Sequence, residues 1–178
     1  MLEAWPAICA RTPNAVLVLA PRHPERFARV AALAREKKAL LVQRSLWNGG
    51  AVTAGSVFLL DSIGELGSVY CLATVAFVGG SLVPAGGHNP LEPARFGVPV
   101  VMGLHYENFR DAVELLRSAD ALHVVERASV GEAIMSLLAN TDGTATMGMR
   151  GKKVFEEQAG ATQRAVDAVV QLLSEGNA

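Results

Sequence analysis

The chain has 178 residues and a formal net charge of −1, from 16 basic and 17 acidic side chains. This length suits one domain with a sizeable core, and 51% hydrophobic against 19% charged residues excludes a disordered chain. The near-neutral charge offers no general attraction to nucleic acid or anionic membranes, so we expect no nucleic-acid partner. The two cysteines, Cys9 and Cys71, lie far apart and form no metal-ligand or disulfide pattern, which favours a reducing compartment.

Apolar runs of strand length alternate with amphipathic segments along the whole chain. In chain order we predict strand 15–20, helix 24–38, strand 39–43, strand 56–60, helix 64–73, strand 75–78, helix 90–96, strand 98–102, helix 108–118, strand 121–125, helix 129–139 and a helical tail over 146–174. The tail is expected to be two helices broken near Gly160, and the run Ala15–Ala20 reads as a strand buried on both faces. No run is long enough to span a bilayer.

Six strands separated by helices predict the α/β class, with a doubly wound, Rossmann-like parallel sheet of six strands. We expect the strand order 3-2-1-4-5-6. We treat residues 1–178 as one nucleotide-binding domain. Sheets of this kind bind ligands at the carboxyl ends of their strands, near the point where the strand order reverses. The turns after strands one, three, four and five are therefore the candidate sites.

The first two of these turns offer groups that suit an anion. Arg22 follows strand one, where a guanidinium can bind a phosphate or carboxylate, although a solvated arginine beside a helix start explains it equally well. No G-x-G-x-x-G run is present, so the fingerprint of nicotinamide dinucleotide binding is absent. In the turn after strand three, Gly64 permits a close backbone approach. Ser62 and Glu65 have the spacing of a capping box, which on its own indicates only a capped helix.

The turn after strand four is the most unusual segment, because glycines surround a serine in the run Gly79–Gly87. Asn89 is a good helix N-cap and Pro90 suits the first helical position. Glu92 can reach back to the Asn89 amide, but a carboxylate at this edge also suits a ribose diol. His88 is either a ligand contact or a structural residue. After strand five, the backbone at Gly103 could read a base edge. The residues alone thus indicate a phosphate- or nucleotide-binding sheet, without selecting a reaction.

The run Val75–Ala94, with its core GGSLVPAGGHNPLEP, closely resembles the signature of 3-deoxy-D-manno-octulosonic acid (Kdo) transferases. Three further pieces fit in the same order. They are PRHPERF at 21–27, DSIGEL at 61–66, and PVVMG at 99–103 with Asn108 and Phe109. The similarity extends over nearly the whole chain from about Pro13 and fades in the tail.

This resemblance implies one half of a GT-B glycosyltransferase, in which two Rossmann-like domains face each other across a cleft. The family transfers Kdo from CMP-Kdo to the lipid A precursor in lipopolysaccharide biosynthesis of Gram-negative bacteria. The chain resembles the C-terminal, donor-binding domain, so we expect a fragment that is soluble and inactive alone. The N-terminal acceptor domain would carry the membrane anchor, at the cytoplasmic face of the inner membrane, and the catalytic base. The implied reaction inverts the anomeric centre and needs no metal or cofactor, only the donor substrate CMP-Kdo.

The resemblance also assigns candidate residues to the donor nucleotide, with Glu92 on the ribose. The assigned positions are Pro21, Arg22, Ile63, Gly64, Glu65, Asn89, Pro90, Leu91 and Glu92. Further possible contacts are Gly80, Ser81, His88, Met102 and Gly103. No catalytic residue and no metal ligand is expected within this chain.

Three alternatives stay open. The first is the donor-binding half of another GT-B enzyme, a UDP-sugar transferase or an epimerase. The second is a non-enzymatic nucleotide- or phosphate-binding domain, such as a signalling receiver. For a receiver, Asp61 fits loosely, but Pro21-Arg22-His23 stands where an acidic cluster is needed. The third is a purely structural interaction domain, which leaves the glycine-rich run unexplained.

Overall fold

The computed structural model describes the backbone of residues 1–175 and the side chains of residues 1–160. The strands are β1 (Leu17–Leu19), β2 (Leu41–Gln43), β3 (Val57–Leu59), β4 (Ala76–Val78), β5 (Val100–Met102) and β6 (Leu122–Val124). The α-helices are α1 (Trp5–Arg11), α2 (Phe27–Glu36), α3 (Leu66–Tyr70), α4 (Leu91–Ala94), α5 (Arg110–Ser118), α6 (Val130–Ala139) and α7 (Thr141–Glu175). Short 3-10 helices are η1 (Pro24–Arg26), η2 (Arg44–Leu46), η3 (Glu107–Phe109) and η4 (Arg127–Ser129).

Each strand lies within its predicted range, and all strand pairs are parallel, so the predicted α/β class is confirmed. The hydrogen-bonded ladders form two three-stranded sheets, in the orders β1-β3-β2 and β4-β5-β6. The predicted order 3-2-1 for the first half is therefore wrong, because β3 lies between β1 and β2. The three residues of β3 are apolar and buried, which suits a central strand with both edges paired.

The strand β1 also differs from its prediction as a strand buried on both faces. Val16 and Val18 are 37% and 39% exposed, whereas the alternating Leu17 and Leu19 are half-buried. Alternation of this kind places one face against the core and leaves the other open. The prediction of burial on both faces is therefore wrong, because β1 lies at the edge of its sheet and one of its faces is exposed.

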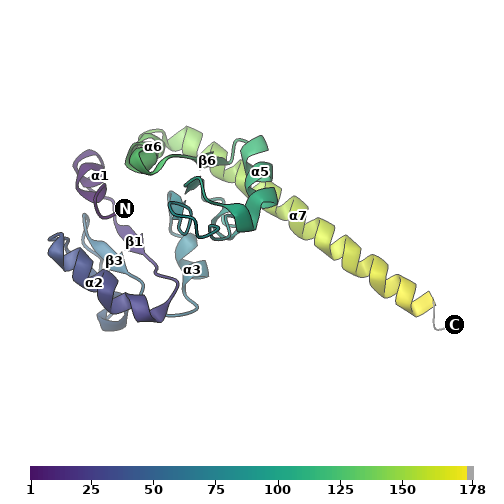
Figure 1. The fold of residues 1–178 in the computed structure, drawn as a ribbon, viewed down its shortest axis with the longest axis horizontal. Coiled ribbons are helices and arrows are strands. Elements are labelled where there is room, and N and C mark those ends of the chain that lie inside the picture. The colour runs from purple at the N-terminus through teal and green to yellow at the C-terminus, as the bar shows by residue number, and fades with distance from the viewer. Residues whose placement is uncertain (176–178) are drawn as a thin grey trace.

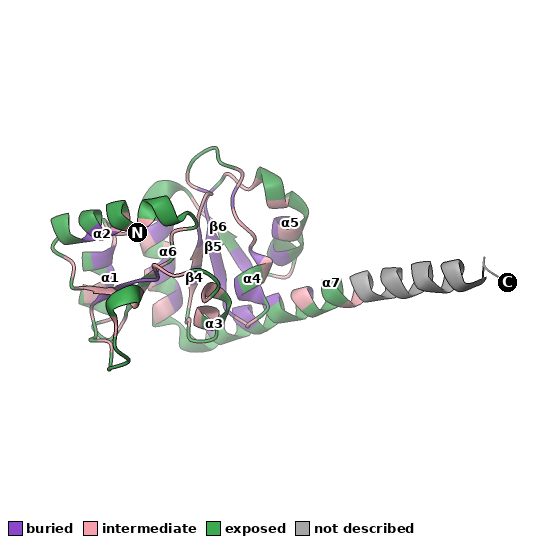
Figure 2. Cartoon of the chain, turned by 90° about the horizontal axis from the view of Figure 1, so that it is seen from below, coloured by how far each residue is buried: buried purple, intermediate pink, exposed green. Residues whose placement is uncertain are grey.

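Two apolar clusters hold the elements together. One joins Met102 of β5 and Val78 of β4 to Leu116 of α5 and to Val154 of α7. The other packs Trp5 of α1 and residues of α6 against both β3 and β5, so it ties the two sheets to each other. Figure 2 shows buried residues on β4–β6 and on the facing side of α4 and α5, with others on α1 and α2.

The helices bring three corrections. The helix α1 was not predicted, since its seven residues are too few for a clear period; burial of Trp5 and Ile8 stabilises it. The tail does not break near Gly160: α7 is one helix of 35 residues that extends past the rest of the domain (Figure 1). At Ser129, the side chain makes no capping bond to α6. Within the described residues, no helix has the length and apolar character of a membrane span.

Candidate functional site

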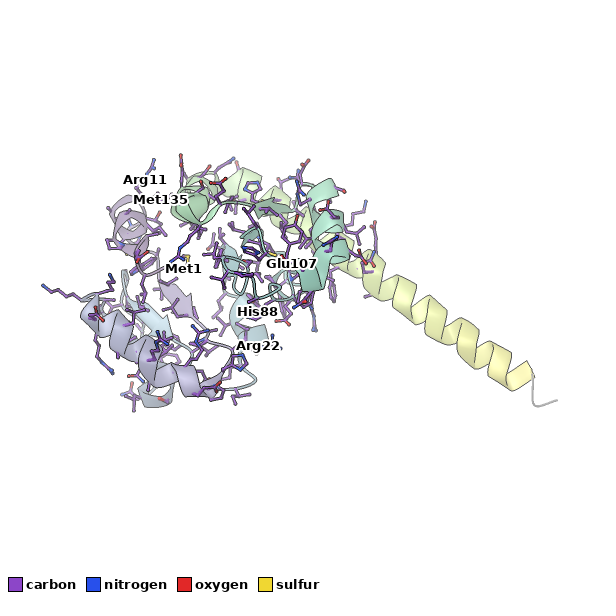
Figure 3. The ribbon with its side chains drawn as sticks, viewed as in Figure 1. Met1, Arg11, Arg22, His88, Glu107 and Met135 are labelled. Carbon is purple, nitrogen blue, oxygen red and sulfur yellow. The ribbon has the colours of Figure 1, made fainter. Side chains whose placement is uncertain are left out.

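The carboxyl ends of β1 and β4 meet through one pair of side chains. Nη1 of Arg22 lies 3.2 Å from Nδ1 of His88, although 66 residues separate them in the chain. Figure 3 shows the two side chains pointing toward one another from the turn after β1 and the loop after β4. Since Arg22 has only N–H donors, His88 accepts through Nδ1 and is neutral. The structure thus brings together two predicted site residues from different sheets.

His88 is held by the glycine-rich loop around it. Its backbone N–H donates to the Gly79 carbonyl at 3.1 Å, and a Cβ built on Gly80, where φ is +72°, would lie 3.2 Å from the imidazole. Burial, together with the positive charge of Arg22, lowers the pKa of His88 below its ordinary 6.5, against an opposing effect of Glu92. Glycine at position 80 therefore serves both the backbone conformation and the close packing of the ring.

We expect Arg22→Gln to raise the pKa of His88 toward its ordinary value, because the variant removes a neighbouring positive charge. In the wild type, the unfolded chain binds a proton at His88 more readily than the folded chain. The free energy of unfolding should therefore fall as the pH drops from the ordinary pKa through the lowered one, and this dependence should weaken in the variant. NMR titration of the imidazole protons measures the pKa. Arg26→Gln is the control, and identical His88 curves in wild type and Arg22→Gln would contradict the contact.

The turn between β3 and α3 is held by its own acidic residues. The Glu65 carboxylate accepts hydrogen bonds from Arg44 and from the Ser62 hydroxyl, rather than serving as half of a capping box. The Ser62 bond, followed by the Arg44 contacts, lowers the pKa of Glu65 below its usual value. Between Ser62 and Glu65, the Ile63 side chain is 80% exposed and the backbone of Gly64 has φ +88°. The tip of the turn is thus open to a ligand, whereas the Glu65 carboxylate is occupied.

At the start of α4, one residue caps the helix and a different residue supplies a carboxylate without a partner among the described side chains. Asn89 caps the helix, since its Oδ1 accepts the Leu91 N–H at 3.0 Å, and Pro90 is buried. The predicted return of Glu92 to the Asn89 amide is not formed, because the Asn89 oxygen alone makes the cap. Among the described side chains, the exposed Glu92 carboxylate has no hydrogen-bond or ion-pair partner. It is therefore free to accept hydroxyl groups.

A surface pocket of about 270 Å³ opens between α3 and α4 beside Glu92. Asn89 and Leu91 also line it, and Tyr70 stacks on Phe96 there with ring centroids 6.5 Å apart. Burial, with a contribution from the Glu92 charge, raises the pKa of Tyr70 to about 12, so its hydroxyl stays protonated. The pocket thus joins an aromatic wall to the free carboxylate, and neither aromatic residue was predicted.

Three of the possible contacts lie inside the protein. Ser81 is fully buried; its hydroxyl donates to the Val78 carbonyl at 2.6 Å and accepts the Gly103 N–H at 2.9 Å. Met102 is also fully buried. Ser81, Met102 and Gly103 therefore support the glycine-rich loop from below and are themselves shielded from solvent. At Gly80, by contrast, a side chain would meet the His88 imidazole, because an added Cβ would lie 3.2 Å from the ring.

One basic residue of the site was missed because the turn after β2 was not considered. Arg44 follows β2 directly and contacts Glu65 across the sheet edge. Its position could have been predicted from the sequence, since a basic residue directly after a strand suits an anion-binding edge. Among the residues whose side chains are described, no three His, Cys, Asp or Glu lie close enough to bind one metal ion.

Comparison with known proteins gives several long matches. No protein-family model matches the chain. A 3-deoxy-D-manno-octulosonic acid transferase of Haemophilus influenzae is 39% identical over 169 residues, which are 94% of this chain and 39% of that protein. A transferase of the same name from Bordetella pertussis is 34% identical over 161 residues, 90% of this chain and 38% of that protein. The chain thus spans about two fifths of the length of these relatives.

A solved structure covers the same region. The crystal structure of the C-terminal CMP-Kdo binding domain of WaaA from Acinetobacter baumannii superposes with a TM-score of 0.78 at 36% identity. The match covers 86% of this chain and 80% of that domain, which confirms the predicted fold class and the resemblance. Because the solved domain is 36% identical and the match covers most of this chain and most of that domain, the protein belongs to the 3-deoxy-D-manno-octulosonic acid transferase family.

Proposed function

We propose that the chain is the donor-binding domain of a glycosyltransferase that transfers Kdo from CMP-Kdo to the lipid A precursor in lipopolysaccharide biosynthesis. The observation that carries the proposal is the likeness to a CMP-Kdo binding domain, at 36% identity and a TM-score of 0.78. The free Glu92 carboxylate, which follows β4, and the Arg22 guanidinium, which follows β1, supply groups that suit a nucleoside phosphate.

The residues suggest a division of labour around the nucleotide. Glu92 would accept hydrogen bonds from the two ribose hydroxyls, and Asn89, Pro90 and Leu91 would set the position of that carboxylate. Arg22, oriented by His88, would donate to the phosphate. Pro21, Ile63 and Gly64 would line the same ligand from the turns after β1 and β3.

In the proposed reaction, the oxygen of an acceptor hydroxyl attacks the anomeric carbon of Kdo. The bond from that carbon to the phosphate oxygen breaks, and CMP leaves with the electron pair, so the anomeric centre is inverted. Arg22 would stabilise the charge that develops on the leaving phosphate, and we propose that no metal is needed. The acceptor proton would pass to a base in the N-terminal acceptor domain, which would also anchor the complete protein at the cytoplasmic face of the inner membrane.

We expect the chain alone to bind CMP weakly, with a dissociation constant of about 0.1–10 mM, and more tightly than UMP or UDP. We expect weak binding because this chain would supply only one wall of the cleft, so that water still contacts the other side of the ligand. Ordering the loop 79–87 also costs entropy. NMR titration with the three nucleotides measures this preference and maps the shifted amides.

Tighter binding of UMP or UDP would replace the proposal by a UDP-sugar enzyme, and shifts far from Arg22 and Glu92 would contradict the proposed site. Kdo transfer from CMP-Kdo to a lipid A precursor by the chain alone would show that the catalytic base lies within it. This outcome would overturn the assignment of the base to the acceptor domain.

A further inference from the structure

The segment Gln43–Ser45, where β2 ends and η2 begins, forms hydrogen bonds with the turn Asp61–Glu65 that follows β3. Asp61, two residues after β3, accepts three hydrogen bonds from this segment. The donors are the Ser45 backbone N–H at 2.8 Å, the Ser45 hydroxyl at 2.6 Å and Nε2 of Gln43 at 3.0 Å. Partial burial raises the pKa of Asp61, but these bonds outweigh it and the net pKa is lowered. The carboxylate is therefore held in its ionised form.

The same segment also binds the other end of the turn. Nε and Nη2 of Arg44 donate to one oxygen of Glu65, at 3.1 and 2.8 Å, while the Ser62 hydroxyl donates to the other oxygen. Both side chains of the ion pair are 37% exposed, so water screens the pair only in part. Both oxygens of Glu65 are therefore hydrogen-bonded, and its bond with Ser62 joins the two residues that flank Ile63 and Gly64.

Arg44 is itself fixed in place. Its guanidinium lies 5.8 Å from the centre of the Trp47 ring, in the range of a cation–π contact. Trp47 packs edge-on against Phe58 of β3 with centroids 5.5 Å apart, and its indole N–H donates to the Gly50 carbonyl at 2.9 Å. Arg44 therefore approaches Glu65 while it contacts a tryptophan that packs on the central strand β3.

We infer that Gln43–Ser45 is a clamp that sets the shape of the turn Asp61–Glu65 for the donor nucleotide, with Arg44 as a positioning residue that acts through Glu65. This inference rests on the proposed function. The exposed Ile63 and the left-handed Gly64 form the tip of the turn, where they would face the ligand. Neither residue has a polar side chain that could hold it in place, so their placement depends on the carboxylates of Asp61 and Glu65 on either side.

A double-mutant cycle on CMP binding tests the clamp. Arg44→Gln and Glu65→Gln should each raise the dissociation constant of the folded chain about fivefold or more, and the double variant should be no worse than either single one. Arg44→Lys, which keeps a point charge but loses the two-donor geometry, should lie between Arg44→Gln and wild type. Arg29→Gln, on the exposed face of α2, is the matched control and should bind as wild type does.

A second readout needs no ligand. In Arg44→Gln the amide resonances of Ile63 and Gly64 should move, whereas in Arg29→Gln they should not. If wild type fails to bind CMP, the proposed function falls, and these amide shifts still decide whether Arg44 holds the turn. Shifts confined to residues 44–47 would overturn the inference. So would an unchanged dissociation constant in Arg44→Gln, or additive effects in the double variant, because additivity means that Arg44 acts independently of Glu65.

Discussion

Glu92→Gln is expected to weaken CMP binding at least tenfold while leaving the free energy of unfolding nearly unchanged. A hydrogen bond to a charged group is worth about 1.5–3 kcal/mol, and about 1.4 kcal/mol corresponds to a factor of ten. The stability should hold because the Asn89 oxygen, and not Glu92, caps α4. The neutral amide keeps the shape of the side chain but replaces one acceptor oxygen by a donor.

NMR titration of the folded variant with CMP measures the affinity, and urea denaturation measures the stability. Glu36→Gln is the matched control, since Glu36 is an exposed carboxylate at the last residue of α2 and is not among the proposed site residues. If Glu92→Gln bound CMP with wild-type affinity, the proposed hydrogen bonds between Glu92 and the ribose would be refuted. A large loss of stability with unchanged affinity would instead restore the capping role that its position in the sequence first indicated.

Gly103→Ala is expected to destabilise the chain by about 1–3 kcal/mol or more, the usual range for overpacking. A Cβ at this position would lie 2.2 Å from the backbone oxygen of Ser81 and 2.6 Å from its carbonyl carbon. Backbone cannot rotate aside as a side chain does, so the glycine-rich loop has to move. For a chain of this length, that loss corresponds to a fall in Tm of roughly 2–4 °C per kcal/mol.

The shift should also reach the site, because Ser81 links the loop to the end of β5. The Ser81 carbonyl accepts the His105 N–H at 3.0 Å, and its hydroxyl accepts the Gly103 N–H. We therefore expect weaker CMP binding in the folded fraction. Gly67→Ala in α3 is the control, since a Cβ there meets nothing within 4 Å and alanine favours a helix. Equal Tm values for the two variants would refute the steric argument.

Local patterns were sufficient for much of this fold. The apolar runs fell on all six strands because burial selects for apolar side chains whatever the partner strand is. The chemistry of the turns was equally local: Gly64 and Gly80 adopt positive φ, and Asn89 caps α4 through its own side chain. The rule that parallel sheets bind ligands at their carboxyl ends then directed attention to Arg22 and Glu92 before any geometry was known.

Side-chain pairing, in contrast, was decided by the tertiary structure. In sequence, Glu65 and Glu92 look alike, because each stands three residues after a residue type that favours helix capping, Ser62 or Asn89. Only the fold brings Arg44 against Glu65 and leaves Glu92 without a partner among the described side chains. The contact of Arg22 with His88 joins turns that are 66 residues apart.

The position of β3 between β1 and β2 was equally beyond local patterns, because an apolar run specifies burial but not which neighbours supply it. A charged side chain finds its partner only after strands from distant parts of the chain have been placed side by side. Composition and periodicity therefore determined which residues stand at the ligand-facing edge. Among the described side chains, long-range packing decided that Glu65 is already paired and that Glu92 has no partner.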